Sequence, residues 1–222
     1  ALWGVIAWRF GIPTSESHAL IAGLMGSALA LGLERLHSGP LLWVAFGMVL
    51  SLALGWLLGR LFRTLLPKNN GRFYDKGQIL GAALTAFLHG AQDGQKFLGV
   101  LALILTFQHG GYALHTWECW ACAALMALGT LLGGRRIIET IGRKMVLLTP
   151  QAGFAAELGC GLTLALCTLL GLPVSTTHAK TAAVLGAGSH PDRKVARELG
   201  MAWILTFPLC GLMAFVLVRL LL

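Results

Sequence analysis

A nine-residue pattern of glycine, proline, hydroxyl and imidazole side chains occurs twice in the chain. The stretch Gly11-Ile-Pro-Thr-Ser-Glu-Ser-His18-Ala matches Gly171-Leu-Pro-Val-Ser-Thr-Thr-His178-Ala at an offset of 160 residues (171 − 11). In each copy, glycine and proline are expected to end one helix, and the serine that follows is suited to cap the next. Because a helix N-terminus offers free N–H groups and partial positive charge, each copy is suited to hold a phosphate-like anion.

A single copy would have a simpler explanation, in which the hydroxyls only cap a helix and the histidine packs against a neighbour. The repetition favours ligand binding, and the match continues at the same offset, where Ala22 pairs with Ala182 and Gly26 with Gly186. We therefore interpret the two copies as an internal duplication.

A second polar group, His89-Gly-Ala-Gln92-Asp93-Gly-Gln-Lys96, lies inside the otherwise apolar stretch 78–107. A charge at the centre of a bilayer costs at least about 2.5–3.5 kcal/mol, so such groups are normally paired and functional. Asp93 and Lys96 are three residues apart and could pair on one face of a helix, which leaves a purely structural ion pair as the alternative. We expect this motif to interrupt the stretch.

The composition sets the class of protein that must position these groups. Of the 222 residues, 56% are hydrophobic and 12% are charged, whereas soluble domains carry about 25% charged residues. This excludes a soluble globular domain, a disordered tail and a disulfide-rich secreted module. The net charge of +8 does not indicate a nucleic-acid partner, because too little polar surface is available. We expect an all-α polytopic membrane protein whose surroundings are the lipid bilayer.

A membrane-spanning helix needs about 20 apolar residues. The apolar stretches predict helices or helix ends at 1–10, 19–33, 40–66, 78–107, 117–132, 151–170, 178–188 and 199–222, with an interfacial amphipathic helix at 135–148. Lys and Arg concentrate in the loops 67–76, 134–144 and 189–198, which we therefore place in the cytoplasm. Loops 34–39 and 108–116 are then external, provided that 78–107 crosses once.

With this topology, the two copies of the repeat run in opposite directions. Inverted repeats built around broken helices are typical of secondary transporters, whose substrate sites lie near the bilayer midplane at the break. We expect an inverted-topology repeat with broken or re-entrant helices. Residues 1–66 would end the first repeat, 67–76 would form a cytoplasmic loop, and 77–222 would form the second repeat.

Together, these motifs resemble the inorganic phosphate transporter family of sodium- or proton-coupled permeases. That family carries a motif like H-G-A-N-D-x-x-N and a motif like G-x-P-x-S-x-T-H in each of two inverted halves, and the segment 136–157 is similar to its central segment. The resemblance implies a multi-pass protein of a bacterial inner membrane, not an enzyme, that moves inorganic phosphate by symport with H⁺ or Na⁺. No cofactor, metal ligand or catalytic residue is expected, and a homodimer is a candidate assembly.

The resemblance also implies a phosphate site where the two breaks meet. The implied substrate-binding residues are Asp93, Gln92, Ser175, Thr176, Thr177, Ser15 and Ser17. The implied coupling or gating residues are Glu16, His18, His89, Lys96, His178 and Lys180. The two repeat histidines could orient the loops or carry protons.

Several residues depart from the family pattern. Gln92 stands where the family usually has Asn, Lys96 replaces a second Asn, Glu16 replaces a Ser or Thr, and Lys180 follows the second repeat motif. A lysine side chain has donors but no acceptor, so it cannot ligate sodium. Our hypothesis is that Lys96, with Lys180, replaces part of the charge of a coupling cation and favours proton coupling.

The offset places a first copy of the Asp-bearing motif before residue 1. We therefore expect the chain to hold the end of the first half and nearly all of the second, and not to transport alone.

Other functions stay open from the residues. The same donors could serve another oxyanion such as sulfate, a metal–phosphate complex, or a phosphate sensor without turnover. An intramembrane hydrolase using Ser175, His178 and Asp93 is disfavoured, because G-x-S-x-G is absent and duplicated Ser and His residues have no catalytic purpose.

Overall fold

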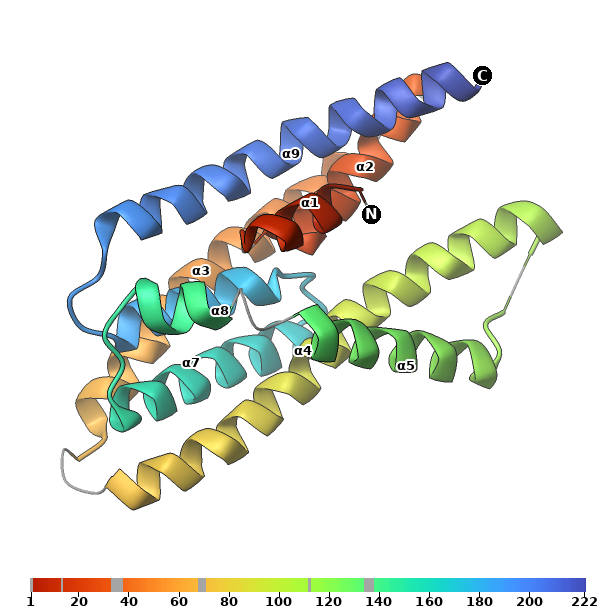
Figure 1. Cartoon of the computed structure of the whole chain (residues 1–222). Coiled ribbons are helices and arrows are strands. Elements are labelled where there is room, and N and C mark those ends of the chain that lie inside the picture. The colour runs from red at the N-terminus through yellow and green to blue at the C-terminus, as the bar shows by residue number, and fades with distance from the viewer. Residues whose placement is uncertain (1, 13, 33–37, 68–70, 112, 134–137) are drawn as a thin grey trace.

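Helices make up nearly all of the regular structure, since a backbone in lipid must satisfy its own hydrogen bonds. The computed structural model describes residues 2–12, 14–32, 38–67, 71–111, 113–133 and 138–222. Figure 1 shows its elements, which are α1 (Leu2–Phe10), α2 (Glu16–Ala30), α3 (Ser38–Leu65), α4 (Gly71–His109), α5 (Thr116–Gly133), the π-helical turn η1 (Thr140–Lys144), α7 (Pro150–Leu169), α8 (Thr176–Ala187) and α9 (Arg193–Leu221). Within the described residues, α3, α5, α7 and α9 are long and apolar enough to cross a membrane. The prediction of an all-α polytopic membrane protein is confirmed.

The two predicted helix breaks are present and have the same construction. After α1 the chain turns at Gly11 (φ 67°), and after α7 it turns at Gly171 (φ 64°). This left-handed region strains residues with a Cβ, so glycine is suited to both positions. The side chains of Ser15 and Ser175 then accept hydrogen bonds from the first turns of α2 and α8. The same local sequence therefore builds the same break twice.

The repeats are inverted, as predicted, and they exchange partners. From the break, α2 runs toward the end of the molecule that carries the C-terminus, whereas α8 runs toward the opposite end (Figure 1). Helix α8 packs on α3 of the other repeat, and α2 packs on α9. The division of the chain at 1–66, 67–76 and 77–222 stays a prediction, although α3 does end at Leu65 and α4 does begin at Gly71.

Helix α4 contradicts one sequence prediction. The expected interruption at 89–96 is wrong, because α4 is continuous over 39 residues. Its polar side chains satisfy one another along the helix: His89 and Lys96 both reach Asp93, at i,i+4 and i,i+3 spacing. The backbone therefore has no need to unwind. At about 1.5 Å per residue the helix is about 58 Å long. It is not among the described helices that are both long and apolar enough to cross a membrane, so the single crossing of 78–107 stays a prediction.

Two further boundaries differ from the sequence predictions. Helix α9 begins at Arg193 rather than at 199, because Asp192 caps it by accepting from the backbone N–H groups of Lys194 and Val195. The predicted interfacial helix 135–148 ends at Lys144, and its residues 134–137 lie outside the described part. It ends early because Leu147 pairs with Ser189 through backbone hydrogen bonds of 3.0 and 3.2 Å.

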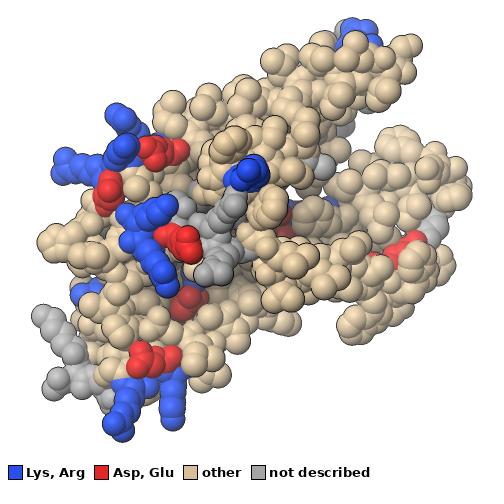
Figure 2. Space-filling view, viewed as in Figure 1, with Lys and Arg blue, Asp and Glu red and all other residues tan. Residues whose placement is uncertain are grey.

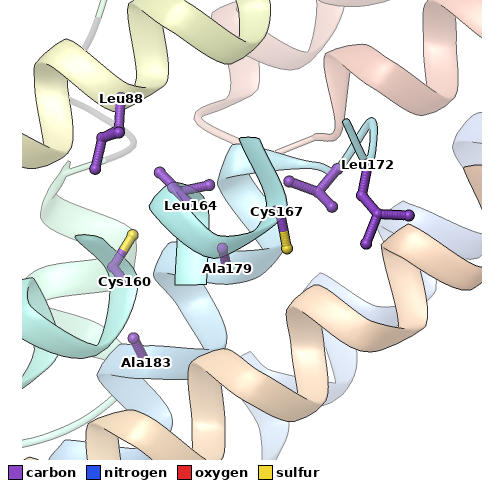
Figure 3. Packing of buried hydrophobic residues seen from close by; sticks show 8 residues of the cluster. Leu88, Cys160, Leu164, Cys167, Leu172, Ala179 and Ala183 are labelled. Atoms are coloured by element: carbon purple, nitrogen blue, oxygen red, sulfur yellow. The ribbon is translucent and has the colours of Figure 1, made fainter. Parts of the chain in front are cut away.

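The buried core centres on α7 and α8, the helices that carry the second break. Figure 3 shows small and branched side chains from both helices and from the break meeting Leu88 of α4. The outer helices instead expose large apolar side chains, for example Phe107 at 83% and Leu131 at 81%. This distribution suits a protein whose outer surface faces lipid.

Charged side chains collect at one end of the molecule. Figure 2 shows most of the Lys and Arg residues at the end where Figure 1 places the start of α4 and the start of α9. The grouping of the basic loops on one side agrees with the sequence prediction. That this side is cytoplasmic stays a prediction.

Candidate functional site

The two broken helices meet at their N-termini. Ser15 Oγ donates a hydrogen bond of 2.9 Å to Ser175 Oγ, although the two residues are 160 positions apart. Each hydroxyl also accepts a hydrogen bond from the backbone N–H three residues later, at 3.3 Å. Both side chains are buried. The equivalent serines of the two repeats therefore touch where the inverted halves face each other.

The two repeat histidines also lie together. The rings of His18 and His178 are 4.7 Å apart, edge to face, and His178 also lies against Trp203. Both ring nitrogens of His178 are buried with no hydrogen-bond partner among the described residues. Ser175 is bonded to the backbone of His178 and not to its ring. The Ser–His pair that a hydrolase requires is thus not formed.

Asp93 of α4 lies beside this junction and joins three side chains. Its Oδ1 lies 2.7 Å from Lys96 Nζ, and its Oδ2 lies 2.8 Å from His89 Nε2. Thr176 Oγ1, in the first turn of α8, donates to Oδ2 at 3.0 Å. The Asp93 side chain is 5% exposed, so water does little to stabilise its charge. The ammonium of Lys96 compensates this charge inside the protein. The prediction that Asp93 and Lys96 pair on one helix face agrees with this geometry.

Lys96 connects α4 to both broken helices. Besides Asp93, its Nζ donates to Ser17 Oγ of α2 at 2.8 Å and to the carbonyl oxygen of Val174 at 2.6 Å. An ammonium group has three hydrogens, and these three bonds use all of them. Sequence reasoning missed Val174, because a backbone carbonyl carries no signal of residue type.

Two cavities border this cluster. The larger, of about 960 Å³, is lined by Glu16, His89, Asp93, Thr176 and Thr177, and otherwise mostly by apolar side chains of α1, α4 and α5. The smaller, of about 290 Å³, is lined by Ser17 and Lys96 among apolar residues of α2 and α4. The α8 hydroxyls and the Asp93 carboxylate therefore border one cavity, whereas the ammonium of Lys96 borders the other.

Gln92 lies apart from the Asp93 bonds. Its Nε2 donates to Thr168 Oγ1 at 2.9 Å and to the carbonyl oxygen of Leu172 at 3.4 Å, and its side chain is buried. The amide thus ties α4 to the end of α7 and to the second break. Sequence reasoning did not find Thr168, which is one of several hydroxyls in an apolar span.

We expect Gln92→Met to lower the stability of the protein by about 1–3 kcal/mol, because it leaves a buried carbonyl without its donor. The effect on phosphate affinity should be smaller than the effect on stability. Thermal unfolding of detergent-purified protein, together with equilibrium phosphate binding, measures both quantities. A Gln92→Met variant that keeps its melting temperature but binds no phosphate would show that the amide acts on the ligand.

Lys180, the second lysine of the predicted site, has a separate partner. It pairs with Glu157 of α7, which also accepts a hydrogen bond of 2.9 Å from Thr85. Thr85, Glu157 and Lys180 thus join α4, α7 and α8. Among the described residues, the partners of Asp93 are His89, Lys96 and Thr176 rather than Lys180. An acidic residue inside the apolar stretch 151–170 was the available signal for this pair.

An inverted pair of broken helices with buried polar groups at the break is the architecture of a secondary transporter. Comparison with known proteins identifies the family: the sequence profile of the phosphate transporter family matches residues 1–70 and 65–214. The chain belongs to this family. It is an integral, multi-pass membrane protein, and its relatives are transporters rather than enzymes, as the sequence predicted.

Individual relatives agree with this assignment. A "probable low-affinity inorganic phosphate transporter" of Rhizobium meliloti is 36% identical over 96% of this chain and 69% of its own length. A protein of the same description from Mycobacterium tuberculosis is 37% identical over 95% of this chain and 55% of its own length. The human sodium-dependent phosphate transporter 2 is 34% identical over 65% of this chain and 24% of its own.

A solved structure, described as the sodium-dependent phosphate transporter, shares the fold with a TM-score of 0.59 and 21% identity. It matches 99% of this chain and 66% of that one. The chain thus spans between about half and about two thirds of the length of these bacterial relatives and of the solved structure.

Proposed function

We propose that the protein moves inorganic phosphate across a bacterial inner membrane in symport with a cation, H⁺ or Na⁺. The phosphate site would lie at the N-termini of α2 and α8, beside Asp93. One observation carries this proposal: the capping serines of the two inverted breaks touch at 2.9 Å next to a buried, charge-compensated carboxylate. The assembly state, with a homodimer as one candidate, stays a prediction.

The electrostatics of the junction support anion binding. Two helix N-termini direct their partial positive charges to one place, which is a favourable environment for a phosphate. Thr176 and Thr177 both border the larger cavity. The hydroxyl of Thr176 already donates to Asp93, so Thr177 would supply the hydroxyl donor there. Asp93 would repel an anion if it were unpaired, but Lys96 and His89 lie against its two oxygens.

The roles of the remaining predicted residues follow from their places. Glu16 and His89 border the larger cavity with Asp93, so both are placed to exchange protons with its contents. Ser15 and Ser175 form the junction itself. Ser17 accepts a hydrogen bond from Lys96 and donates one of 3.4 Å to the carbonyl oxygen of Val174 in the second break. The descriptions of the relatives, which name inorganic phosphate and sodium, support the same substrate class and cation coupling.

The function is tested by uptake of radiolabelled phosphate into proteoliposomes that carry the full protein. Sodium and pH gradients should be imposed separately, with sulfate as a competitor. Uptake driven by either gradient and resistant to sulfate supports the proposal. Equilibrium binding without uptake would instead support a phosphate sensor, and equal competition by sulfate would support a general oxyanion transporter.

We expect Thr176→Val to lower phosphate uptake by about tenfold or more, because it removes a hydroxyl that donates to Asp93 in the lining of the larger cavity. Thr163→Val is the matched control. Thr163 is buried in α7, and its hydroxyl donates to the carbonyl oxygen of Gly159 within the same helix. Equal uptake by the two variants would count against a site at the start of α8.

A further inference from the structure

The oxygen atoms around Lys96 form a set that is typical of a cation site. They come from a carboxylate (Asp93), a hydroxyl (Ser17) and a backbone carbonyl (Val174), at 2.6 to 2.8 Å from Nζ. Hard cations in proteins select these three oxygen types. In transporters with broken helices, unwound carbonyls such as that of Val174 coordinate the coupling cation.

The three oxygens belong to separate parts of the fold. Asp93 lies on α4, Ser17 on α2 of the first repeat, and Val174 in the break that precedes α8 of the second repeat. A cation bound by all three would hold the two inverted repeats against α4. The ammonium of Lys96 already contacts all three oxygens, so it occupies the position that a bound cation would take.

A purely structural ion pair would not need this arrangement. Asp93 and Lys96 could pair at i,i+3 spacing on the surface of α4 alone. Instead, the lysine side chain is only 16% exposed, and all three of its hydrogens point to oxygens of different elements. Because no hydrogen is left over, Lys96 also does not donate directly to a phosphate in this conformation.

We propose that Lys96 is a tethered substitute for a free monovalent cation, so that phosphate binding to this protein does not require sodium. The inference rests on the proposed function, because it concerns the same phosphate site. The opposite change, from lysine to a side chain that can bind a cation, should create a requirement for sodium. A shorter, neutral side chain that offers an oxygen, as in Lys96→Asn, vacates the position of the ammonium and adds a fourth oxygen ligand to the three already present.

The test measures binding of radiolabelled phosphate to the purified full protein in sodium chloride and in choline chloride of equal concentration. The wild-type affinity should differ by less than about twofold between the two salts. Lys96→Asn should bind phosphate at least about tenfold more tightly in sodium chloride than in choline chloride, because sodium then supplies the charge that compensates Asp93. Lys96→Met, which fills the space without charge or oxygen, should bind weakly in both salts.

Lys194→Asn is the control for the loss of a lysine, because Lys194 is exposed at the start of α9. It should behave as the wild type does. Sodium-dependent thermal stabilisation gives a second readout, since a cation that binds only the folded state raises the melting temperature. We expect this stabilisation for Lys96→Asn and not for the wild-type protein.

The outcomes separate this inference from the proposed function. Wild-type protein that binds phosphate only in sodium would overturn the inference and leave the proposed function intact. Wild-type protein that binds phosphate in neither salt would overturn the proposed function itself. Lys96→Asn that folds, binds phosphate and ignores sodium would show that the ammonium does not occupy a cation position. If Lys96→Asn fails to fold, the wild-type comparison still decides the first point.

Discussion

Asp93→Asn is expected to reduce phosphate uptake by about a hundredfold or more, equivalent to about 3 kcal/mol. The substitution removes the charge that Lys96 and His89 contact at 2.7 and 2.8 Å, and it leaves an ammonium in a largely enclosed position. Removing one partner of a buried ion pair typically costs about 3–5 kcal/mol of stability. Uptake into proteoliposomes and thermal unfolding in detergent measure the two effects separately.

A double substitution distinguishes loss of folding from loss of function. Asp93→Asn combined with Lys96→Met removes both members of the Asp93–Lys96 pair, and replacing both members of a buried pair is often close to neutral. We therefore expect the double variant to recover most of the lost stability while uptake stays low. If uptake returned along with stability, Asp93 would have a structural role only.

Gly26→Ala is expected to destabilise the protein by about 3 kcal/mol or more, at the upper end for overpacking, because the clash is with rigid backbone. A Cβ on Gly26 would lie 2.0 Å from the carbonyl oxygen of Gly211 in α9, where ordinary contact begins at 3.4 Å. Helices α2 and α9 would have to separate, and this movement would displace the first break from the second. Thermal unfolding and phosphate uptake should both decline.

Gly23→Ala is the matched control in the same helix. A Cβ at Gly23 meets nothing within 4 Å, so the substitution should instead stabilise α2 by about 0.5–1 kcal/mol, the usual gain for alanine over glycine in a helix. The two substitutions, three residues apart, should therefore change the melting temperature in opposite directions. Equal behaviour would mean that α2 and α9 do not pack through Gly26.

Gly186 is the equivalent of Gly26 in the second repeat, and it also lies against the backbone of a neighbouring helix. A Cβ on Gly186 would lie 2.1 Å from the carbonyl oxygen of Trp56 in α3. Each repeat thus places a glycine at the point where its short helix crosses the long helix of the other repeat. The sequence match between Gly26 and Gly186 was visible, but the helix that each one contacts was not.

Features that depend on neighbouring residues could be predicted well. Gly11 and Gly171 introduce a turn, Ser15 and Ser175 cap the helix that follows, and the basic loops lie together at one end. The failure in α4 has a local cause as well. We expected a polar motif to break an apolar helix, but side chains at i,i+3 and i,i+4 spacing neutralised one another and left the backbone intact.

The amino-acid order thus sufficed for the duplication, its inversion and the two breaks, because periodicity, glycine and proline chemistry and loop charge act over short distances. It allowed the pairing of Asp93 with Lys96 only as an alternative to a break in α4. The contact between Ser15 and Ser175, the exchange of helices between the repeats and the place of Val174 beside the ammonium arose only on folding. These contacts join segments far apart in the chain, and one partner is often a backbone carbonyl, which every residue carries and no sequence pattern can single out.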